Sequence, residues 1–373
     1  MSAQVKSTRK KILQISIGLD VGGVEEVLRL MAENLDPKEY EVSALTFDAG
    51  KIATNLQKKG LKIFSFDVSS QKGLSRHIAK IRFIFETIKS GRFDVVHNHN
   101  CFHLYPLLLC RKWFRLNFKA VYSVHQFAPW SGIKGLLYSR TLSAHDIILP
   151  VSTPVKDLLI TKYRINPGKM RVNHNTVEPR DSIPDQTEAR NALNIPADHV
   201  VISSVGRLVS NKHLDLLIKT CSHLTESFPK LTLIIVGNGP EEEKLRSLAK
   251  LYPQSDIRIL GYLNNISHAY SAADIHVSLG SSETFSLVSL EAMSHGVAAI
   301  ACLPNGVVDV IDDPSTGFLI PANDSAALSE KLLYLLHQPS EMHAMGLRGR
   351  KRYDTVFAMP HNIARLRKIY AEL

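Results

Sequence analysis

The chain has 373 residues, of which 45% are hydrophobic and 21% are charged, and its formal net charge is +10 at pH 7. This composition excludes a disordered or fibrous protein and supplies enough apolar residues for buried cores. Because the length exceeds the size at which one core keeps growing, we expect two domains of roughly 150 to 200 residues each.

Short β-rich runs alternate with amphipathic stretches through the first half of the chain, as in parallel βα units. An apolar strand at 11–18 leads through a glycine turn into a helix at 24–35. Further strands are expected at 41–47, 62–68, 94–100, 120–126 and 146–152. This pattern predicts a first doubly wound domain over residues 1–178.

The second half begins again in the same way after a linker that contains Pro179, Pro184 and Pro196. A strand and glycine turn at 200–208 precede a helix at 213–224, and further strands are expected at 231–237, 257–262, 274–280, 298–302 and 317–321. We therefore expect a second doubly wound domain over residues 179–357, with a cleft between the two. The segment from Phe357 to Leu373 is a basic amphipathic helix.

The positive charge is concentrated in the first half. Residues 1 to 175 carry 27 Lys and Arg against 13 Asp and Glu, a balance of +14, whereas residues 176 to 373 carry 18 against 22, a balance of −4. A basic domain suits an anionic partner, which could be a membrane surface, a nucleic acid or a phosphorylated acceptor. A solvated basic surface is the alternative.

No run approaches the 18 apolar residues that a membrane span needs, and no cleavage site follows the basic N-terminus. The four cysteines form no Cys-x-x-Cys pair and no zinc spacing, and they are Cys101, Cys110, Cys221 and Cys302. We therefore expect a cytoplasmic protein with reduced thiols.

The most informative stretch is Ala273 to Gly296, where an apolar strand runs through Gly280 and two serines into a helix. The backbone N–H groups of Thr284, Phe285 and Ser286 are expected at that turn, where open α/β sheets bind phosphorylated ligands. Glu283 and Glu291 bracket the start of the helix. An anion site flanked by two carboxylates that can hold sugar hydroxyls describes a nucleotide-sugar site.

This stretch resembles the Glu-x(7)-Glu signature of retaining glycosyltransferases of the family 4 type. The resemblance extends from about Lys11 to the C-terminus and is most specific over residues 201 to 320. It implies the GT-B fold, in which two Rossmann-like domains face each other across a cleft and the last helix, here 358–373, packs back on the first domain. It also implies that Glu283 contacts the hydroxyls of the donor sugar and Glu291 the ribose of the nucleotide.

Two cations follow a strand of the second domain. Arg207 and Lys212 can neutralise a diphosphate, Arg by its planar fork and Lys as a point charge. The family resemblance assigns them the same role, although the family commonly has Lys-Gly where this chain has Lys212-His213. Surface cations beside a turn are the alternative interpretation.

Two glycine turns complete the expected donor site. Gly237 and Gly239 lie in a V-G-x-G-P turn that lines the nucleotide pocket in the family, and Glu242 stands where a dinucleotide fingerprint needs its third glycine. Gly22 and Gly23 follow the first strand and, by resemblance, face the donor phosphates. Plain tight turns remain the alternative.

His125 ends a predicted strand of the first domain, where the family places a histidine near the reacting sugar. A core histidine bonded to the backbone is the alternative. His97 and His99 have the spacing of one strand face, but no carboxylate or thiol accompanies them, so packing or acceptor contact is preferred to a metal.

Two stretches, 76–92 and 111–119, mix cations with aliphatic and aromatic residues. Cations next to Trp113, Phe114 and Phe118 suit an anionic bilayer surface. Core-facing helices with basic outer faces would show the same pattern.

Together these features predict a retaining, metal-independent hexosyltransferase that uses no cofactor beyond its nucleotide-diphosphate sugar. A lipid-linked or saccharide acceptor is expected, in the synthesis of a cell-surface polysaccharide or glycolipid, with the enzyme at the inner face of the cytoplasmic membrane. A GT-B relative that catalyses epimerisation or phosphorolysis, or a basic nucleic-acid-binding protein, is the alternative.

Overall fold

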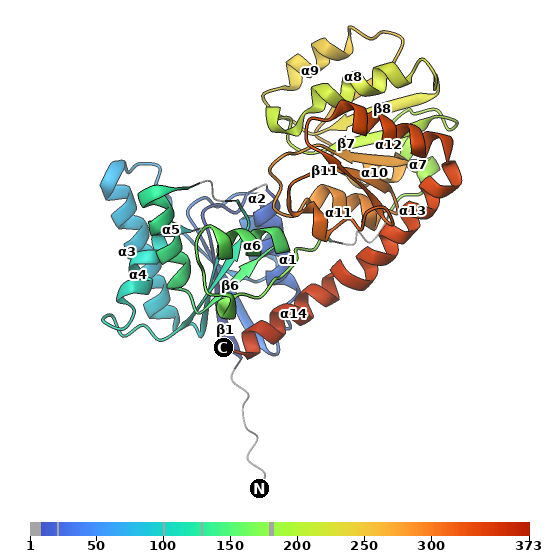
Figure 1. Cartoon of the computed structure of the whole chain (residues 1–373). Helices are drawn as coiled ribbons and strands as arrows, with labels where there is room; N and C mark the ends of the chain where they lie inside the picture. Colours follow the sequence, from blue (N-terminus) through green and yellow to red (C-terminus); the bar gives the residue numbers. More distant parts are fainter. Residues whose placement is uncertain (1–8, 21, 100, 128–129, 179–182) are drawn as a thin grey trace. The chain divides into compact units, whose positions relative to one another are not determined.

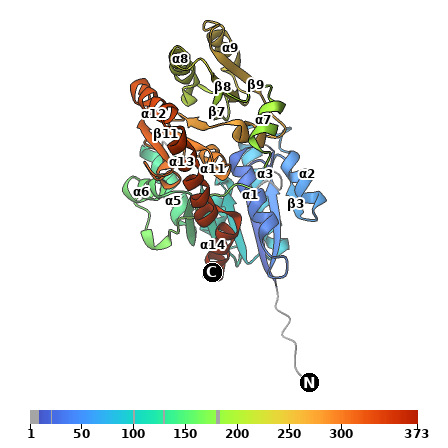
Figure 2. The ribbon, with the colours of Figure 1, turned by 90° about the vertical axis from the view of Figure 1, so that its right-hand side faces the viewer.

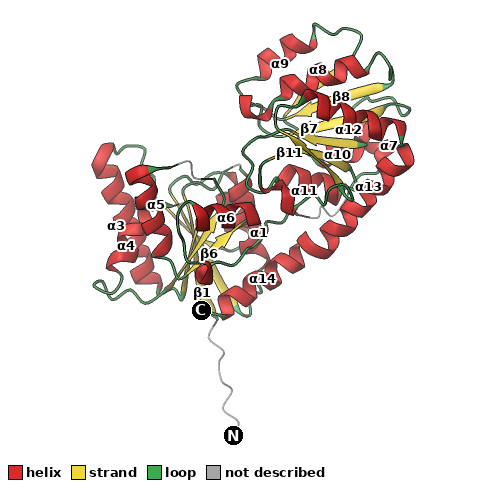
Figure 3. Cartoon of the chain, in the orientation of Figure 1, coloured by secondary structure: helices red, strands yellow, loops and turns green. Residues whose placement is uncertain are grey.

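The computed structural model describes residues 9–20, 22–99, 101–127, 130–178 and 183–373 (Figure 1). The chain divides into two compact units: unit 1 is Met1–Asn175 with Met359–Leu373, and unit 2 is Thr176–Ala358. Pro179 of the expected linker and the basic first eight residues lie outside the described residues. Each unit is a helix-covered sheet (Figure 3).

Unit 1 contains a six-stranded parallel sheet in the order β3-β2-β1-β4-β5-β6. Its strands are β1 (Lys10–Ser16), β2 (Tyr40–Thr46), β3 (Lys62–Ser65), β4 (Val95–His99), β5 (Lys119–Val124) and β6 (Ile147–Pro150). Its helices are α1 (Gly23–Asn34), α2 (Lys51–Lys58), α3 (Gly73–Gly91), α4 (Tyr105–Cys110), α5 (Gly132–Ser143), α6 (Thr153–Thr161) and α14 (Met359–Ala371).

Unit 2 repeats this topology, with the sheet order β12-β11-β10-β7-β8-β9 and all pairs parallel. Its strands are β7 (Val200–Val205), β8 (Leu231–Val236), β9 (Asp256–Gly261), β10 (Ile275–Ser278), β11 (Ala298–Leu303) and β12 (Gly317–Pro321). Its helices are α7 (Gln186–Ala192), α8 (Leu214–Leu224), α9 (Glu242–Ala249), α10 (Ser267–Ala272), α11 (Leu287–Ser294), α12 (Ser325–His337) and α13 (Pro339–Arg352).

The strand order of both sheets reverses direction beside the first strand of the unit, between β1 and β4 in unit 1 and between β7 and β10 in unit 2. Open sheets bind ligands at the carboxyl ends of the strands at such a switch point. The prediction of two doubly wound domains is confirmed. Gly22 and Gly23 follow β1, a strand at the switch point of unit 1, whereas Gly237 and Gly239 follow β8, which is the neighbour of β7 in unit 2.

Local sequence signals explain several helix starts. Ser152, Asp185 and Asp324 each accept a hydrogen bond from the backbone N–H three residues on, which satisfies a donor at the start of α6, α7 and α12. The helices then bury their apolar faces against the sheets. Leu13, Ile15 and Val96 belong to the core of unit 1, and Ile202 and Val277 belong to that of unit 2.

Helix α14 belongs to unit 1, although it lies far along the chain from the other elements of that unit. Two views show it alongside α1 (Figures 1 and 2). The Tyr370 ring lies 6.1 Å from that of Tyr40, and Lys10 Nζ donates to the Tyr370 carbonyl at 2.6 Å. A π-helical turn at Tyr353–Phe357 precedes α14, just before the boundary between the units.

None of the helices in the described ranges is long and apolar enough to cross a bilayer. The thiols of Cys101, Cys221 and Cys302 are free and buried, while the side chain of Cys110 is outside the described part of the chain.

Candidate functional site

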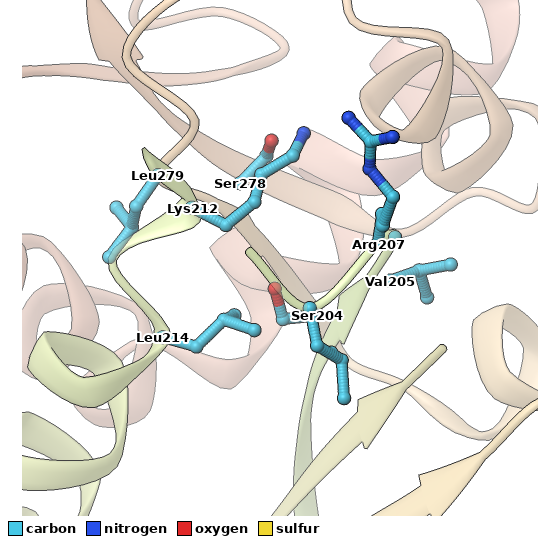
Figure 4. A pocket seen from close by; sticks show the side chains of 9 residues that line it. Ser204, Val205, Arg207, Lys212, Leu214, Ser278 and Leu279 are labelled. Atoms are coloured by element: carbon cyan, nitrogen blue, oxygen red, sulfur yellow. The ribbon is translucent and has the colours of Figure 1, made fainter. Parts of the chain in front are cut away.

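The loops that follow β7, β8, β10 and β11 meet at the carboxyl edge of the sheet in unit 2. A small hollow lies at the ends of β7 and β10 and is lined by Ser204, Val205, Gly206, Arg207, Leu208, Lys212, Leu214, Ser278 and Leu279. Figure 4 shows Lys212 ending beside Ser278, with Arg207 extending alongside. The structure thus brings both sequence-predicted cations to one edge.

The loops after β7 and β8 are held together by their backbones. Gly206 N donates to the Val236 carbonyl and Leu208 N to the Asn238 carbonyl, both at 2.9 Å. Gly237 has φ 132°, and a Cβ there would lie 1.9 Å from the Gly206 carbonyl oxygen. Gly237 and the nearby Gly239 therefore fix the loop that carries Arg207, whatever further contact they make with a ligand.

Arg207 is exposed, and within the described ranges its guanidinium forms no ion pair. Lys212 is different, because its ammonium group pairs with the Glu283 carboxylate. Ser278 Oγ donates to the same Glu283 oxygen at 3.4 Å. At this edge a carboxylate therefore neutralises Lys212, whereas Arg207 has no ion-pair partner among the residues that the structure describes.

A tight turn carries Glu283 and leads into α11. Ser286 has φ 67°, in the left-handed region, and the helix begins at Leu287, between Glu283 and Glu291. Phe285 is buried and packs edge-on against Phe357, with ring centroids 5.8 Å apart. The side chain of Phe285 therefore supports the turn, and only its backbone is placed to meet a ligand.

The loop after β11 clamps this turn. Asn305 Nδ2 donates to the carbonyls of Gly280 and Cys302 at 3.0 and 2.6 Å, and Gly306 N donates to the Glu283 carbonyl at 2.8 Å. A Cβ at Gly306 would lie 1.7 Å from the Thr284 carbonyl oxygen. Sequence reasoning missed Asn305 and Gly306, because their role depends on the adjacency of β10 and β11.

Glu291 lies one turn into α11. Its carboxylate accepts a hydrogen bond of 2.5 Å from the hydroxyl of Tyr270, which is buried on α10. Burial of that tyrosine and its short bond fix the orientation of the carboxylate. No pattern in the sequence pointed to Tyr270, since it stands 21 residues away on a different helix.

In unit 1, Gly22 and Gly23 lie at the start of α1, as predicted from their position after the first strand. The Gly22 carbonyl accepts the first helical hydrogen bond, from Glu26 N at 3.0 Å. His125 directly follows β5 and is 8% exposed, and burial lowers its pKa to about 4. His125 is thus neutral at pH 7 and lies at the carboxyl edge of its own sheet.

His97 and His99 are buried on β4. Across the described ranges no group of three or more His, Cys, Asp or Glu side chains is arranged to hold a metal ion. Burial lowers the pKa of His97 to about 3.

Several buried histidines, His99 among them, should make the fold sensitive to mild acid. Burial lowers the pKa of His97 and His276 to about 3 and that of His125 and His145 to about 4, all below the unfolded value of 6.5. Below pH 6.5 these histidines bind protons in the unfolded chain but not in the folded chain. Their contribution to the free energy of unfolding is therefore fully present above pH 6.5 and is lost as the pH falls below it. Each histidine should cost about 1.4 kcal/mol per pH unit.

The free energy of unfolding in urea at pH 7.0, 6.0 and 5.0 measures this effect while most carboxylates remain ionised. A decrease of several kcal/mol is expected. An equal free energy at pH 7.0 and 5.0 would contradict the buried, neutral state of these imidazoles.

Two family models cover most of the chain. Residues 185–352 match "Glycosyl transferases group 1", and residues 21–181 match "Glycosyltransferase Family 4". An uncharacterised glycosyltransferase of Haemophilus influenzae is 26% identical over 327 residues, which are 85% of this chain and 88% of the relative.

Solved structures share the whole fold. A glycosyltransferase from Rickettsia africae superimposes with a TM-score of 0.84 at 21% identity, over 98% of each chain. Anabaena HepE, solved in complex with UDP and glucose, gives a TM-score of 0.82 at 18% identity, over 98% of this chain and 100% of that chain.

Proposed function

The chain belongs to the GT-B glycosyltransferases of the family 4 type, and we propose that it transfers a sugar from a nucleotide-diphosphate sugar to an acceptor hydroxyl with retention of anomeric configuration. The observation that carries the proposal is the edge of unit 2 where Arg207, Lys212 and Glu283 come together. Two cations and one carboxylate at a strand edge suit a diphosphate joined to a polyhydroxyl group.

The two cations supply the charge that a departing diphosphate needs. Arg207 and Lys212 would stabilise the leaving group electrostatically, which is the work of a divalent ion in other enzymes, and the proposed reaction uses no metal and no further cofactor. The turn at Thr284 to Ser286 would add backbone N–H groups.

Donor binding must rearrange the Lys212–Glu283 ion pair. A diphosphate that draws the ammonium group toward itself frees Glu283 to accept hydrogen bonds from the hydroxyls of the sugar. We assign Glu291, oriented by Tyr270, to the ribose. In unit 1, His125 and the backbone at Gly22 and Gly23 are proposed to contact the reacting sugar and the donor phosphates.

Retention is proposed to follow from attack on the same face of the sugar. The acceptor oxygen bonds to the anomeric carbon on the face from which the phosphate oxygen leaves with the bonding electron pair, and the proton of the acceptor passes to that phosphate oxygen. A double displacement would need a carboxylate nucleophile below the anomeric carbon. Neither Glu283, which is paired with Lys212, nor Glu291 is an evident one.

Incubation with UDP-, GDP- and ADP-linked sugars tests the function, with and without a lipid-linked acceptor and in the presence of EDTA. We expect release of the nucleoside diphosphate and a product that keeps the anomeric configuration of the donor sugar, as read from NMR couplings at the anomeric proton. Interconversion of nucleotide sugars without release would favour an epimerase. No turnover together with binding to oligonucleotides would favour a nucleic-acid-binding protein.

The acceptor is proposed to be membrane-borne, in glycolipid or cell-surface polysaccharide synthesis, with the enzyme peripheral on the inner face of the cytoplasmic membrane. Unit 1 has what we call the apolar-basic surface, which carries exposed large apolar side chains next to exposed cations. It consists of Leu74 and Ile78 on α3, Leu109, Trp113 and Phe114 at and after the end of α4, Ile133, Leu136 and Leu137 on α5, and the cations Lys112, Arg115 and Lys134.

The elements under the apolar-basic surface are packed together. Phe85 of α3 contacts Phe114 with ring centroids 5.1 Å apart, and Phe102 contacts Tyr138 of α5 at 6.1 Å. Trp113 is 90% exposed and Ile133 is 79% exposed. Residues 95 to 145 contain six Lys and Arg and no Asp or Glu. Exposed apolar side chains within residues 109 to 137, in a stretch of the chain without Asp or Glu, fit an anionic bilayer.

Two residues of the stretch 111–119, which the sequence suggested for membrane binding, do not belong to the apolar-basic surface. Phe118 is buried in the core of unit 1, and Arg111 forms two hydrogen bonds to Asp146, at 2.8 and 3.2 Å. The composition of the stretch does not show that Phe118 is buried or that Arg111 forms an ion pair, because both depend on the fold.

Vesicle binding should therefore depend on acidic lipid and on salt, because exposed charges are screened over roughly 10 Å at 0.1 M salt. Replacing Lys112, Arg115 and Lys134 together by Gln should weaken binding to anionic vesicles roughly 10²-fold, at about 1 kcal/mol per cation. Trp113→Ala should weaken it as well. Co-sedimentation at low and high salt is the measurement.

The matched control replaces Lys38, Lys58 and Lys162, which are exposed cations in other segments of unit 1, by Gln. It removes the same charge and should bind nearly as well as the unaltered chain. Equal binding to neutral vesicles, or equal loss in both triple variants, would exclude this surface as the docking site.

A further inference from the structure

Three buried histidines form a stack on one face of the sheet in unit 1. His97 and His99 are two residues apart on β4, and His125 directly follows β5, the neighbouring strand. The rings of His97 and His99 lie 4.3 Å apart and those of His99 and His125 5.4 Å apart, at interplanar angles of 27° and 20°. Each of the three side chains is at most 8% exposed.

Hydrogen bonds hold both ends of this stack. His99 Nδ1 lies 3.1 Å from His125 Nε2. At the other end, His97 Nδ1 lies 2.7 Å from the Tyr370 hydroxyl of α14, and His97 Nε2 lies 2.8 Å from Ser123 Oγ of β5. The His97 ring is therefore fixed on both sides and supports the face of His99.

All three imidazoles are neutral at pH 7, because burial lowers each pKa and the neighbouring histidines lower it further for His97 and His99. A neutral imidazole carries one proton, on either of its two nitrogens. When two neutral imidazoles share a hydrogen bond, one nitrogen must donate and the other accept. The contact between His99 and His125 therefore couples their tautomers.

The direction of this hydrogen bond follows from the other nitrogen of His99. His99 Nε2 is buried and has no hydrogen-bond partner among the residues that the structure describes. A buried N–H without an acceptor is rarer and costlier than a lone pair without a donor. The proton of His99 is therefore placed on Nδ1, from which it is donated to His125 Nε2.

We infer that His99 is a positioning residue, which holds His125 in the tautomer that carries its proton on Nδ1. His97 stacks on His99 and is itself held by hydrogen bonds to Tyr370 and Ser123. This inference rests on the proposed function, in which His125 contacts the reacting sugar. His125 Nδ1–H then donates to an oxygen of the substrate as a neutral group. A mobile tautomer would offer that donor for only part of the time.

Nitrogen NMR of the full chain labelled with ¹⁵N-histidine measures the tautomer directly. The His125 signals are identified by their loss in His125→Gln. We expect a single tautomer, protonated on Nδ1, from pH 5.5 to pH 8. In His99→Leu, which keeps the bulk but removes the donor, His125 should become a mixture of tautomers.

His99→Asn is the conservative variant, because the side-chain amide can place a donor near the position of Nδ1. It should restore the Nδ1–H tautomer of His125. A proton on Nε2 of His125 in the unaltered chain would overturn the inference, and so would an unchanged tautomer in His99→Leu.

Kinetics add a second readout. His99→Leu should lower kcat by roughly tenfold, on the scale of losing a supporting hydrogen bond behind a functional group, with less than a threefold change in KM for the donor. His99→Asn should recover most of kcat.

The matched control is His145→Leu. His145 is equally buried in unit 1, but it precedes β6 at the opposite edge of the sheet and bonds to the Thr141 carbonyl at 2.8 Å. It should leave the His125 tautomer unchanged even where it lowers the melting temperature. Full turnover in His125→Ala would disprove the proposed role of His125, while the NMR result would still decide what His99 does.

Discussion

Replacing Arg207 or Lys212 by alanine is expected to lower the rate of sugar transfer by roughly 10² or more, which is the scale of losing one preorganised contact to a developing negative charge. Both side chains come from the loop after β7, which the glycine turn after β8 holds in place. Release of nucleoside diphosphate in the steady state is the measurement.

Arg207→Ala and Lys212→Ala should differ in their effect on KM. Arg207 has no ion pair to lose within the described ranges, so its loss should remove only contacts to the ligand. Lys212→Ala also leaves Glu283 without its cation, which places an unbalanced negative charge next to an incoming diphosphate. Lys212→Ala should therefore raise KM more than Arg207→Ala does.

Lys219→Ala is the control, because this lysine is exposed on α8, pairs at 3.7 Å with Asp215 and does not line the hollow. It should keep the unaltered rate. If Arg207→Ala and Lys212→Ala also kept that rate, the diphosphate clamp would be assigned to the wrong residues.

Glu283→Gln is expected to lower kcat/KM by roughly 10²-fold, because it keeps the size of the side chain but removes the charge that strengthens hydrogen bonds from sugar hydroxyls. It also frees Lys212, so affinity for the bare nucleoside diphosphate should be retained or increased while transfer falls. This opposite change in affinity and turnover separates a role in holding sugar from a role in the fold.

Glu330→Gln provides the matched comparison, since Glu330 also pairs with a lysine, Lys331, at 2.8 Å, but on the exposed side of α12. Equal kinetic damage in the two variants would show that Glu283 is not part of the site. Circular dichroism and melting temperature establish that both variants are folded.

Much of the fold could be predicted because parallel strands buried on both faces appear as short apolar runs, and each unit contains six of them in repeating order. The strand at Ile275–Ser278 and the helix after the serine-rich turn follow from that pattern. The left-handed conformation of Ser286 at the start of α11 could not be predicted, because serine rarely adopts it.

The residues of the candidate site could be named from the sequence, but the contacts between them could not. Arg207, Lys212 and Glu283 could be named from local motifs, yet the pairing of Lys212 with Glu283 joins residues 71 positions apart. It depends on β7 and β10 being neighbours, which sheet order determines and local sequence does not. For the same reason, the contacts of Tyr270 with Glu291 and of Asn305 with the turn before α11 could not be predicted. The catalytic and binding roles stay predictions.

The histidines show a further limit of sequence reasoning. The spacing of His97 and His99 on one strand face was visible, but their stacking on His125 depends on the register of β4 with β5, and the bond to Tyr370 depends on the return of α14 to unit 1.

Calorimetric titration of nucleoside diphosphates tests the central claim most directly, which is that the loop edge of unit 2 binds the diphosphate of the donor without a metal. UDP, GDP and ADP are titrated in EDTA into the unaltered chain and into the chain with both Arg207→Ala and Lys212→Ala. We predict that at least one of them binds the unaltered chain and binds the double variant roughly 10²-fold or more weakly. Equal affinity for both proteins, or no binding of any of the three, would contradict the account.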